Sequence, residues 1–229
     1  MQSVDRLIVA ADFSTRDEIM ALIDELRGSV GVVKIGLQAF IANGPSLVRD
    51  VVGGGTRVFL DLKLHDIPNT VQHAVAEASA LGAAMLSVHA TGGERMLRAA
   101  ARDGLMVLGV TILTSLDERE LAAIGFSGPA VDHAARLARL SVAAGLGGVV
   151  ASPHEIASIR QACGAGLTIV TPGIRPQGSD SGDQRRTMTP AEAIRAGADY
   201  IVVGRPITGA ENRRDAALRI VEEMDGARV

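Results

Sequence analysis

The feature that most constrains the fold of this 229-residue chain is a regular alternation of short apolar runs with longer segments of helical periodicity. A short continuous apolar run is typical of a strand that is buried on both faces, as in a parallel sheet. Each run is followed by a segment in which apolar residues recur every three or four positions, which predicts a helix. The runs expected as strands cover residues 7–11, 32–36, 57–63, 85–89, 106–113, 148–151, 167–170 and 200–203.

Eight such units in a chain of this length predict an α/β fold, a (β/α)8 barrel of the TIM type, formed as a single domain over residues 1–229. The alternative is an open, doubly wound sheet. The count of eight disfavours it, and so does the lack of a Gly-x-Gly-x-x-Gly pattern after the first run. We find no linker or low-complexity tract that would divide the chain.

Composition and charge exclude several functional classes. The net charge of −3 offers no basic surface for nucleic acid or an anionic membrane, and aromatic residues form only 2% of the chain, too few for a base-stacking platform. The single cysteine, Cys163, excludes an intrachain disulfide. The N-terminus lacks a secretory pattern and no apolar run reaches the length of a membrane span. We therefore expect a cytoplasmic protein that binds neither nucleic acid nor membrane.

The segment from Asp61 to Thr70 carries a dense group of polar side chains at the end of a predicted strand. Asp61 and Lys63 are two positions apart, so a strand would place both side chains on one face. Asp66 follows in the loop, and Asn69 or Thr70 is predicted to cap the next helix. An isolated Asp-x-Lys pair is typical of a structural ion pair, so the interpretation depends on what the other strand ends provide.

The other strand ends bring further polar residues to the end of the barrel where barrel enzymes place their sites. Lys34 and Lys63 both lie in or beside apolar strands, where an unpaired lysine is costly to bury. With Asp61 and Asp66 they can form an array of alternating charge, which shifts pKa values and orients a proton donor. The remaining polar residues at these ends are Asp12, His89, Thr114, Arg175 and Arg205.

The last two strand ends predict a phosphate site, because barrels commonly bind phosphate with the loops after strands seven and eight. Gly204 lets backbone N–H groups approach an anion, and Arg205 offers a bidentate guanidinium. The loop 171–188 is polar, rich in glycine and long for a compact domain, and its part 175–188 is expected to close over a ligand. This loop adds Arg175, Gln177 and Gln184 as candidate ligands. Arg185 and Arg186 fit better with a basic loop exposed to solvent than with a binding role.

Other candidate sites are weaker. No His/Glu cluster has metal-ligand spacing and no Gly-x-Ser-x-Gly motif occurs, so the sequence predicts neither a metal centre nor a serine nucleophile. His65 is expected to be structural, and His89 to be a core histidine bonded to backbone. His133 and His154 are expected on exposed helix surfaces.

Six segments resemble the signature of the orotidine 5'-phosphate decarboxylase family, closest to its bacterial branch. They run in order from about Asp12 to Arg205 at barrel spacing, and no position that we consider essential departs from the pattern. The segments are VKIG (33–36), FLDLKLHDIPNT (59–70), LTS (113–115), TPGIRPQG (171–178), GDQRR (182–186) and VGRP (203–206).

This resemblance implies decarboxylation of orotidine 5'-monophosphate to uridine 5'-monophosphate, the last step of de novo UMP biosynthesis, without a metal ion or organic cofactor. It implies a homodimer in which Asp66 and Thr70 reach into the partner's site, with Lys34, Asp61, Lys63 and Asp66 as catalytic residues. Asp12 and Lys34 would then hold the ribose, Thr114 the pyrimidine, and Arg175, Gln184, Gly204 and Arg205 the phosphate, with Gln177 able to share or replace the role of Gln184.

Two other functions are compatible with the residues. An Asp-x-Lys-x-x-Asp barrel could act on a sugar phosphate through a metal-stabilised enediolate, which predicts additional acidic ligands and a dependence on Mg²⁺. The chain could also be a non-catalytic nucleotide-binding barrel. A pure binder gains nothing from two nearly buried lysines, which disfavours this last function.

Overall fold

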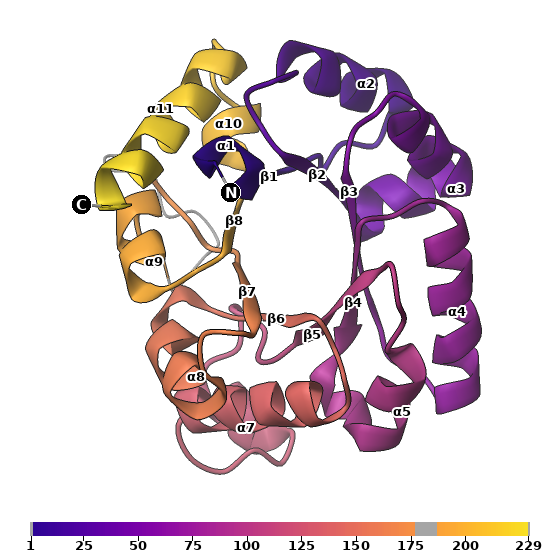
Figure 1. The fold of residues 1–229 in the computed structure, drawn as a ribbon, viewed down its shortest axis with the longest axis vertical. Helices are drawn as coiled ribbons and strands as arrows, with labels where there is room; N and C mark the ends of the chain where they lie inside the picture. The colour runs from indigo at the N-terminus through magenta and orange to yellow at the C-terminus, as the bar shows by residue number, and fades with distance from the viewer. Residues whose placement is uncertain (1, 177–186, 229) are drawn as a thin grey trace.

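The computed structural model describes residues 2–176 and 187–228, and its centre is a closed barrel of eight parallel strands (Figure 1). Neighbouring strands pair in sequence order, and the last strand closes the barrel by pairing with the first. The predicted (β/α)8 architecture is therefore confirmed. The strands are β1 (Leu7–Ala10), β2 (Val32–Gly36), β3 (Val58–Leu64), β4 (Met85–His89), β5 (Met106–Val110), β6 (Gly148–Val150), β7 (Thr168–Thr171) and β8 (Tyr200–Val203).

Helices surround the barrel on all sides (Figure 1). Within the described part of the chain, none of them is both long and apolar enough to cross a membrane. The α-helices are α1 (Ser3–Arg6), α2 (Arg16–Glu25), α3 (Leu37–Gly53), α4 (Pro68–Ala80), α5 (Gly93–Ala100), α6 (Glu118–Ala123), α7 (Ala130–Ala143), α8 (Ile156–Cys163), α9 (Pro190–Ala196), α10 (Arg205–Thr208) and α11 (Arg213–Asp225). Short 3-10 turns, η1 (Ala90–Gly92), η2 (Pro153–Glu155) and η3 (Gly226–Arg228), complete the fold.

Two apolar layers explain why the strands are continuous apolar runs. Side chains of successive strand residues point to opposite faces of the barrel wall. Ile8 and Phe59 belong to the layer inside the barrel, whereas Leu7 and Leu60 belong to the larger layer between the strands and the helices. Each strand is thus buried on both faces over most of its length, which explains the near-continuous apolar runs.

The entry into α4 differs from the expectation that Asn69 or Thr70 caps this helix. The helix begins at Pro68, and Ile67 occupies the N-cap position. Proline suits the first helical position because its fixed φ matches the helix and it has no N–H that would need a partner. Thr70 therefore lies in the first turn, with an exposed side chain.

The expectation for His133 is also wrong, because this residue of α7 is only 6% exposed. Its Nε2 lies 2.9 Å from the carbonyl oxygen of Ser127, and its ring meets Phe126 edge to face. The segment between α6 and α7 thus packs back on the helix, which helical periodicity alone does not reveal. His154 is exposed, as expected.

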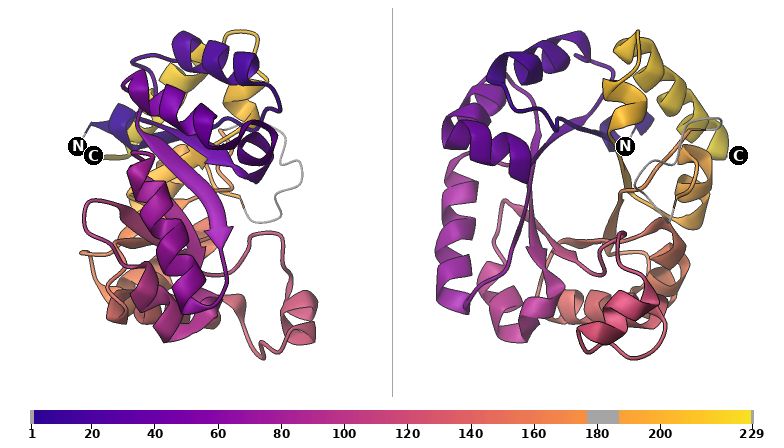
Figure 2. Two further views of the ribbon diagram at one scale, coloured as in Figure 1. Left: turned by 90° about the vertical axis from the view of Figure 1, so that its right-hand side faces the viewer. Right: turned by 180° about the vertical axis from the view of Figure 1, so that it is seen from behind.

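The C-terminal ends of the strands point to one end of the barrel. The side view in Figure 2 (left) shows β3 with its arrowhead at this end, and the pink segment that contains α6 extends beyond the barrel on the same side. The polar residues predicted at the strand ends should therefore meet here.

Candidate active site

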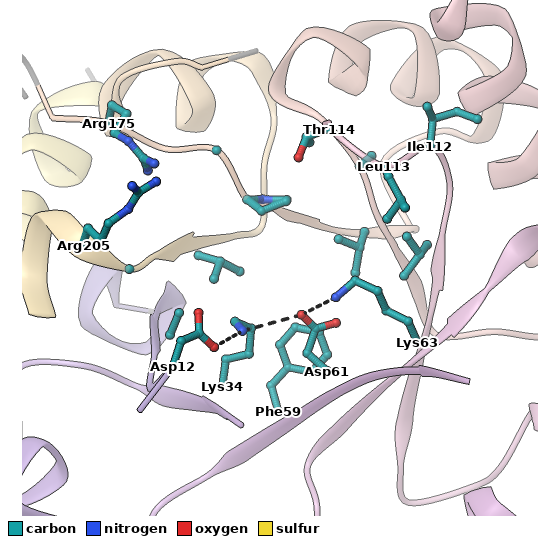
Figure 3. Close-up of a pocket in the computed structure, with 18 residues that line it drawn as sticks. Asp12, Lys34, Phe59, Asp61, Lys63, Ile112, Leu113, Thr114, Arg175 and Arg205 are labelled. Atoms are coloured by element: carbon teal, nitrogen blue, oxygen red, sulfur yellow. Dashed lines mark hydrogen bonds and ion pairs between the residues drawn. The ribbon is translucent and has the colours of Figure 1, made fainter. Parts of the chain in front are cut away.

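Four charged side chains form a continuous chain at this end of the barrel (Figure 3). The Lys34 ammonium donates to Asp12 Oδ1 at 3.0 Å, and its Nζ lies 3.7 Å from Asp61 Oδ2. Lys63 Nζ donates to the same Asp61 oxygen at 2.8 Å. The charges therefore alternate, and each of the two inner groups, Lys34 and Asp61, lies between two groups of opposite sign.

Strand register brings these groups together. Lys34 is the partner of Ala10, two residues before Asp12, and Asp61 is the partner of Gly36. By the alternation of strand side chains, Lys34 and Asp61 share the inward face of the barrel. Both residues are only 9% exposed. Charges buried to this degree are stable only when they are paired, and here each one is.

Gly36 leaves the space that the first ion pair occupies. A Cβ atom at this position would lie 2.9 Å from Lys34 Nζ and 3.0 Å from Asp12 Oδ1. Contacts this short would force one of the two groups to move. Gly36 thus leaves room for the Lys34–Asp12 pair in its observed position, a role that the sequence pattern did not reveal.

Lys63 departs from the regular strand geometry that the Asp-x-Lys spacing predicts. Its φ of +51° is left-handed, the one such value at a non-glycine residue in the described ranges. The pairing of β3 with β4 shifts register between Leu60 and Leu64. Bulges of this kind redirect side chains, and left-handed residues that carry a Cβ concentrate at functional sites. Lys63 thus reaches Asp61 from a bulge.

Ser87 on β4 connects Asp61 to the backbone of this bulge. Its hydroxyl donates to Asp61 Oδ1 at 2.8 Å and accepts from the backbone N–H of Lys63 at 2.9 Å. The side chain is fully buried. Sequence reasoning missed this residue, and the available signal was one polar residue inside the apolar run 85–89.

The surroundings of Asp61 keep its carboxylate ionised. Burial opposes ionisation and raises the pKa, but the positive charges of Lys34 and Lys63 and the hydrogen bonds from Lys63 and Ser87 outweigh it. The pKa of Asp61 is therefore lower than its ordinary value.

His89 is half-buried at the end of β4, with its ring centroid 5.6 Å from that of His65. Burial lowers the pKa of His89, the nearby His65 and Lys63 lower it further, and only Asp61 opposes the shift. The imidazole of His89 is therefore neutral at neutral pH.

The opposite side of the pocket carries two arginines. Arg175 and Arg205 extend their guanidinium groups toward one another, away from Asp61 and Lys63 (Figure 3). All four residues line one cavity of about 290 Å³, to which Thr114 also contributes. A ligand in this cavity can present an anion to the arginines and a second group to the lysines. The other lining residues are Ala10, Asp12, Lys34, Phe59, Val110, Ile112, Leu113, Val150, Ala151, Pro172, Gly173, Val202 and Gly204.

Asp66 and Thr70 are exposed and are not among the described residues that line this cavity. The Asp66 carboxylate accepts a hydrogen bond from the backbone N–H of Ile67 at 2.6 Å. The expected array of Lys34, Asp61, Lys63 and Asp66 is therefore not formed within one chain, and Asp12 provides the second carboxylate. The predicted ligands Gln177 and Gln184 lie outside the described residues, as do Arg185 and Arg186.

The Asp61 carboxylate is fully engaged by its neighbours. Both oxygens of Asp61 accept hydrogen bonds, one from Ser87 and one from Lys63. Over residues 2–176 and 187–228, no group of three or more His, Cys, Asp or Glu side chains is placed to hold a metal ion.

Fold and site together define a (β/α)8-barrel protein with two lysines and two carboxylates in a strand-end pocket. The model of the orotidine 5'-phosphate decarboxylase / HUMPS family matches residues 5–220, and the chain belongs to this family. The resemblance that the six motifs indicated is thereby confirmed.

Two relatives and one solved structure agree with this assignment. Orotidine 5'-phosphate decarboxylase from Anaeromyxobacter dehalogenans is 51% identical over 96% of this chain and 98% of its own length. The Sodalis glossinidius protein of the same name is 49% identical over 97% of this chain and 91% of its own. The crystal structure of orotidine 5'-phosphate decarboxylase from Lactobacillus acidophilus has a TM-score of 0.86 and 31% identity, covering 96% of this chain and 98% of that one.

Proposed function

We propose that this protein is a carboxy-lyase that decarboxylates orotidine 5'-monophosphate to uridine 5'-monophosphate, the last step of de novo UMP biosynthesis, without a metal ion or organic cofactor. The observation that carries the proposal is the charged chain from Asp12 to Lys63, which faces Arg175 and Arg205 across one cavity. A nucleoside monophosphate carries its phosphate and its base at opposite ends, with the ribose between them, and so fits this arrangement.

Lys63 is the proposed proton donor. Loss of CO2 from C6 of the pyrimidine leaves an electron pair in the plane of the ring, which the ring π system cannot delocalise. An ammonium beside C6 stabilises this pair and then gives it a proton, so that an N–H bond breaks and a C–H bond forms. The contact with Asp61 at 2.8 Å orients the ammonium in advance and limits reorganisation during the reaction.

Asp61 and Lys34 complete the chemical end of the site. The ionised Asp61 would repel the carboxylate of the bound substrate, and this repulsion is relieved as the carboxylate leaves as CO2. Lys34 would hold Asp61 in place and, together with Asp12, bind the ribose hydroxyls. The contacts of Lys34 to both carboxylates support this double role.

The arginine end would bind the phosphate. Arg175, Gly204 and Arg205 are the proposed ligands, with Gln184 or Gln177 from the loop 175–188, and Thr114 would contact the pyrimidine. The phosphate is remote from C6, but binding energy gained there can still contribute to catalysis.

We further propose a homodimer in which Asp66 and Thr70 enter the partner's site, so that Asp66 extends the charged chain there. Both residues are exposed, and the intervening Ile67 is 65% exposed. The adjacent helix α3 exposes Leu37 and Ile41, at 50% and 78%. Exposed apolar side chains beside functional polar ones are typical of an interface.

The remaining proposals concern the whole chain. The family model extends over residues 5–220, which supports a single catalytic domain over 1–229. A soluble nucleotide substrate is consistent with a cytoplasmic enzyme.

Loss of the orotidylate absorbance, followed with and without EDTA, tests the proposed activity. We expect turnover at the same rate in both conditions. Turnover that stops with EDTA and returns with Mg²⁺ would contradict a metal-free mechanism. Tight nucleotide binding without turnover would instead indicate a binding protein.

A further inference from the structure

We infer that Ser87 is a positioning residue for the reaction, which holds Asp61 and Lys63 in their reactive arrangement. The inference rests on the proposed decarboxylation and assigns a role to a residue outside the pocket lining. Ser87 is fully buried on β4, so it acts through the residues that it contacts.

The direction of the hydrogen bonds ties Asp61 and Lys63 into one unit. The hydroxyl of Ser87 accepts from the backbone N–H of Lys63, which directs its single proton to Asp61 Oδ1. The other oxygen, Oδ2, accepts from Lys63 Nζ. Each Asp61 oxygen therefore has its own donor. The three hydrogen bonds form a closed ring, which runs from the Lys63 N–H to Ser87, from Ser87 to Asp61, and from Asp61 to the Lys63 ammonium. Hydrogen bonds joined in this way strengthen one another.

Ser87 also supports the backbone conformation of Lys63. The regular pairing of β3 with β4 is interrupted between Leu60 and Leu64, and Ser87 Oγ provides an acceptor for the Lys63 N–H within this gap. A left-handed φ at a residue with a Cβ is unfavourable and persists only where the surroundings hold it. Loss of the hydroxyl would remove one of these supports at the proposed proton donor.

The groups around Asp61 determine how its pKa would change if the hydrogen bond from Ser87 were lost. Lys34 from β2 and Lys63 from β3 lie against its carboxylate, Asp12 lies beyond Lys34, and the neutral His89 follows on β4. The hydrogen bond from Ser87 is one of the interactions that lower the pKa of Asp61. Removing this bond should raise the pKa of Asp61 and leave the arginine end unchanged.

The variant Ser87→Ala tests the inference. We expect kcat to fall by about 10- to 100-fold, the size typical of losing one hydrogen bond to a charged group. KM should stay within about twofold, because the ribose and phosphate contacts remain. The acid limb of the kcat profile should move to higher pH. Ser87→Cys, which keeps a weaker donor, should lie between Ser87→Ala and the wild type.

Ser141→Ala is the matched control. Ser141 is equally buried, but its hydroxyl donates to the carbonyl oxygen of Leu137 within α7, away from the pocket. This change removes the same atom from a buried site, and we expect the wild-type kcat and pH profile from it. Melting temperatures of all variants should be measured alongside, to separate stability from turnover.

The results separate this inference from the proposed function. A wild-type protein that does not turn over orotidylate would contradict the proposed function itself. An active wild type with a Ser87→Ala variant whose kcat and acid limb are unchanged would overturn the role of Ser87. A loss that appears only in KM, or equally in Ser141→Ala, would overturn it as well.

Discussion

Lys63 shows how the site depends on the conformation of single residues. Its left-handed backbone, its salt bridge to Asp61 and its N–H bond to Ser87 all converge on the position of one ammonium group. Gly36 supports the same geometry from β2, because the space beside its Cα is occupied by the Lys34–Asp12 pair. Small changes at these positions should therefore affect catalysis more than folding.

Substitution of Gly36 by alanine should reduce kcat strongly, by about 10-fold or more, because a misplaced charge loses its preorganisation. The new Cβ would displace Lys34 or Asp12, which lie within 3.0 Å of its position. Gly53→Ala is the control, because a Cβ there meets nothing within 4 Å. Steady-state kinetics of both variants measure the effect, and equal activity would exclude the proposed steric role of Gly36.

Asp61 should make the stability of the protein depend on pH. Its pKa is lowered in the folded state, so its contribution to the free energy of unfolding is complete above the unfolded pKa and is lost as pH falls through the folded pKa. Wild-type stability relative to Asp61→Asn should be constant above about pH 5 and decline below about pH 4. Urea unfolding at fixed protein concentration measures this difference. A difference that does not change across this range would show that Asp61 is not held ionised by its neighbours.

At the level of elements, the sequence was sufficient to predict every strand, because each strand is buried on both faces and so forms a continuous apolar run. Helix α10 was not predicted, because four residues are too few to show a period. The bulge of β3 at Lys63 was not predicted either, because it depends on the pairing with β4 and on Ser87. The role of Gly36 depends on side chains from two other positions, and no local pattern reports such a contact.

The junction of β8 with α10 should contribute to affinity for phosphate rather than to chemistry at C6. Arg205→Ala should weaken binding of uridine 5'-monophosphate by about 10- to 100-fold, the cost of losing a charge-assisted hydrogen bond, and leave uridine binding unchanged. Calorimetric titration with both ligands measures this. Arg98→Ala, which removes an exposed arginine that pairs with Glu94 on α5, is the control. Equal losses for nucleoside and nucleotide would contradict the assignment of Arg205 to the phosphate.

At the level of the whole molecule, the segment from Asp66 to Thr70 links catalysis to assembly. Each chain supplies Lys63 to its own pocket, and we propose that it supplies Asp66 to the pocket of its partner. A homodimer that lacks Lys63, or one that lacks Asp66, would then contain no complete site. A dimer with one subunit of each variant would contain one complete site.

Mixing Lys63→Ala subunits with Asp66→Ala subunits therefore tests the shared site. Random exchange gives half of the dimers as hybrids, each with one intact site, so activity should recover to about a quarter of the wild-type value. The assay is turnover after subunit exchange, with hybrids verified by mass spectrometry. Verified hybrids without activity would show that the two residues serve the same pocket of one chain.

The central claim is that the Lys63 ammonium stabilises the charge at C6 and delivers the proton. Its most direct test is the kcat of Lys63→Ala with orotidine 5'-monophosphate, measured on a variant that still binds uridine 5'-monophosphate. Loss of a positioned charge and proton donor predicts a fall in kcat of more than about a thousandfold, with nucleotide binding retained. A kcat near that of the wild type would contradict the assignment of Lys63.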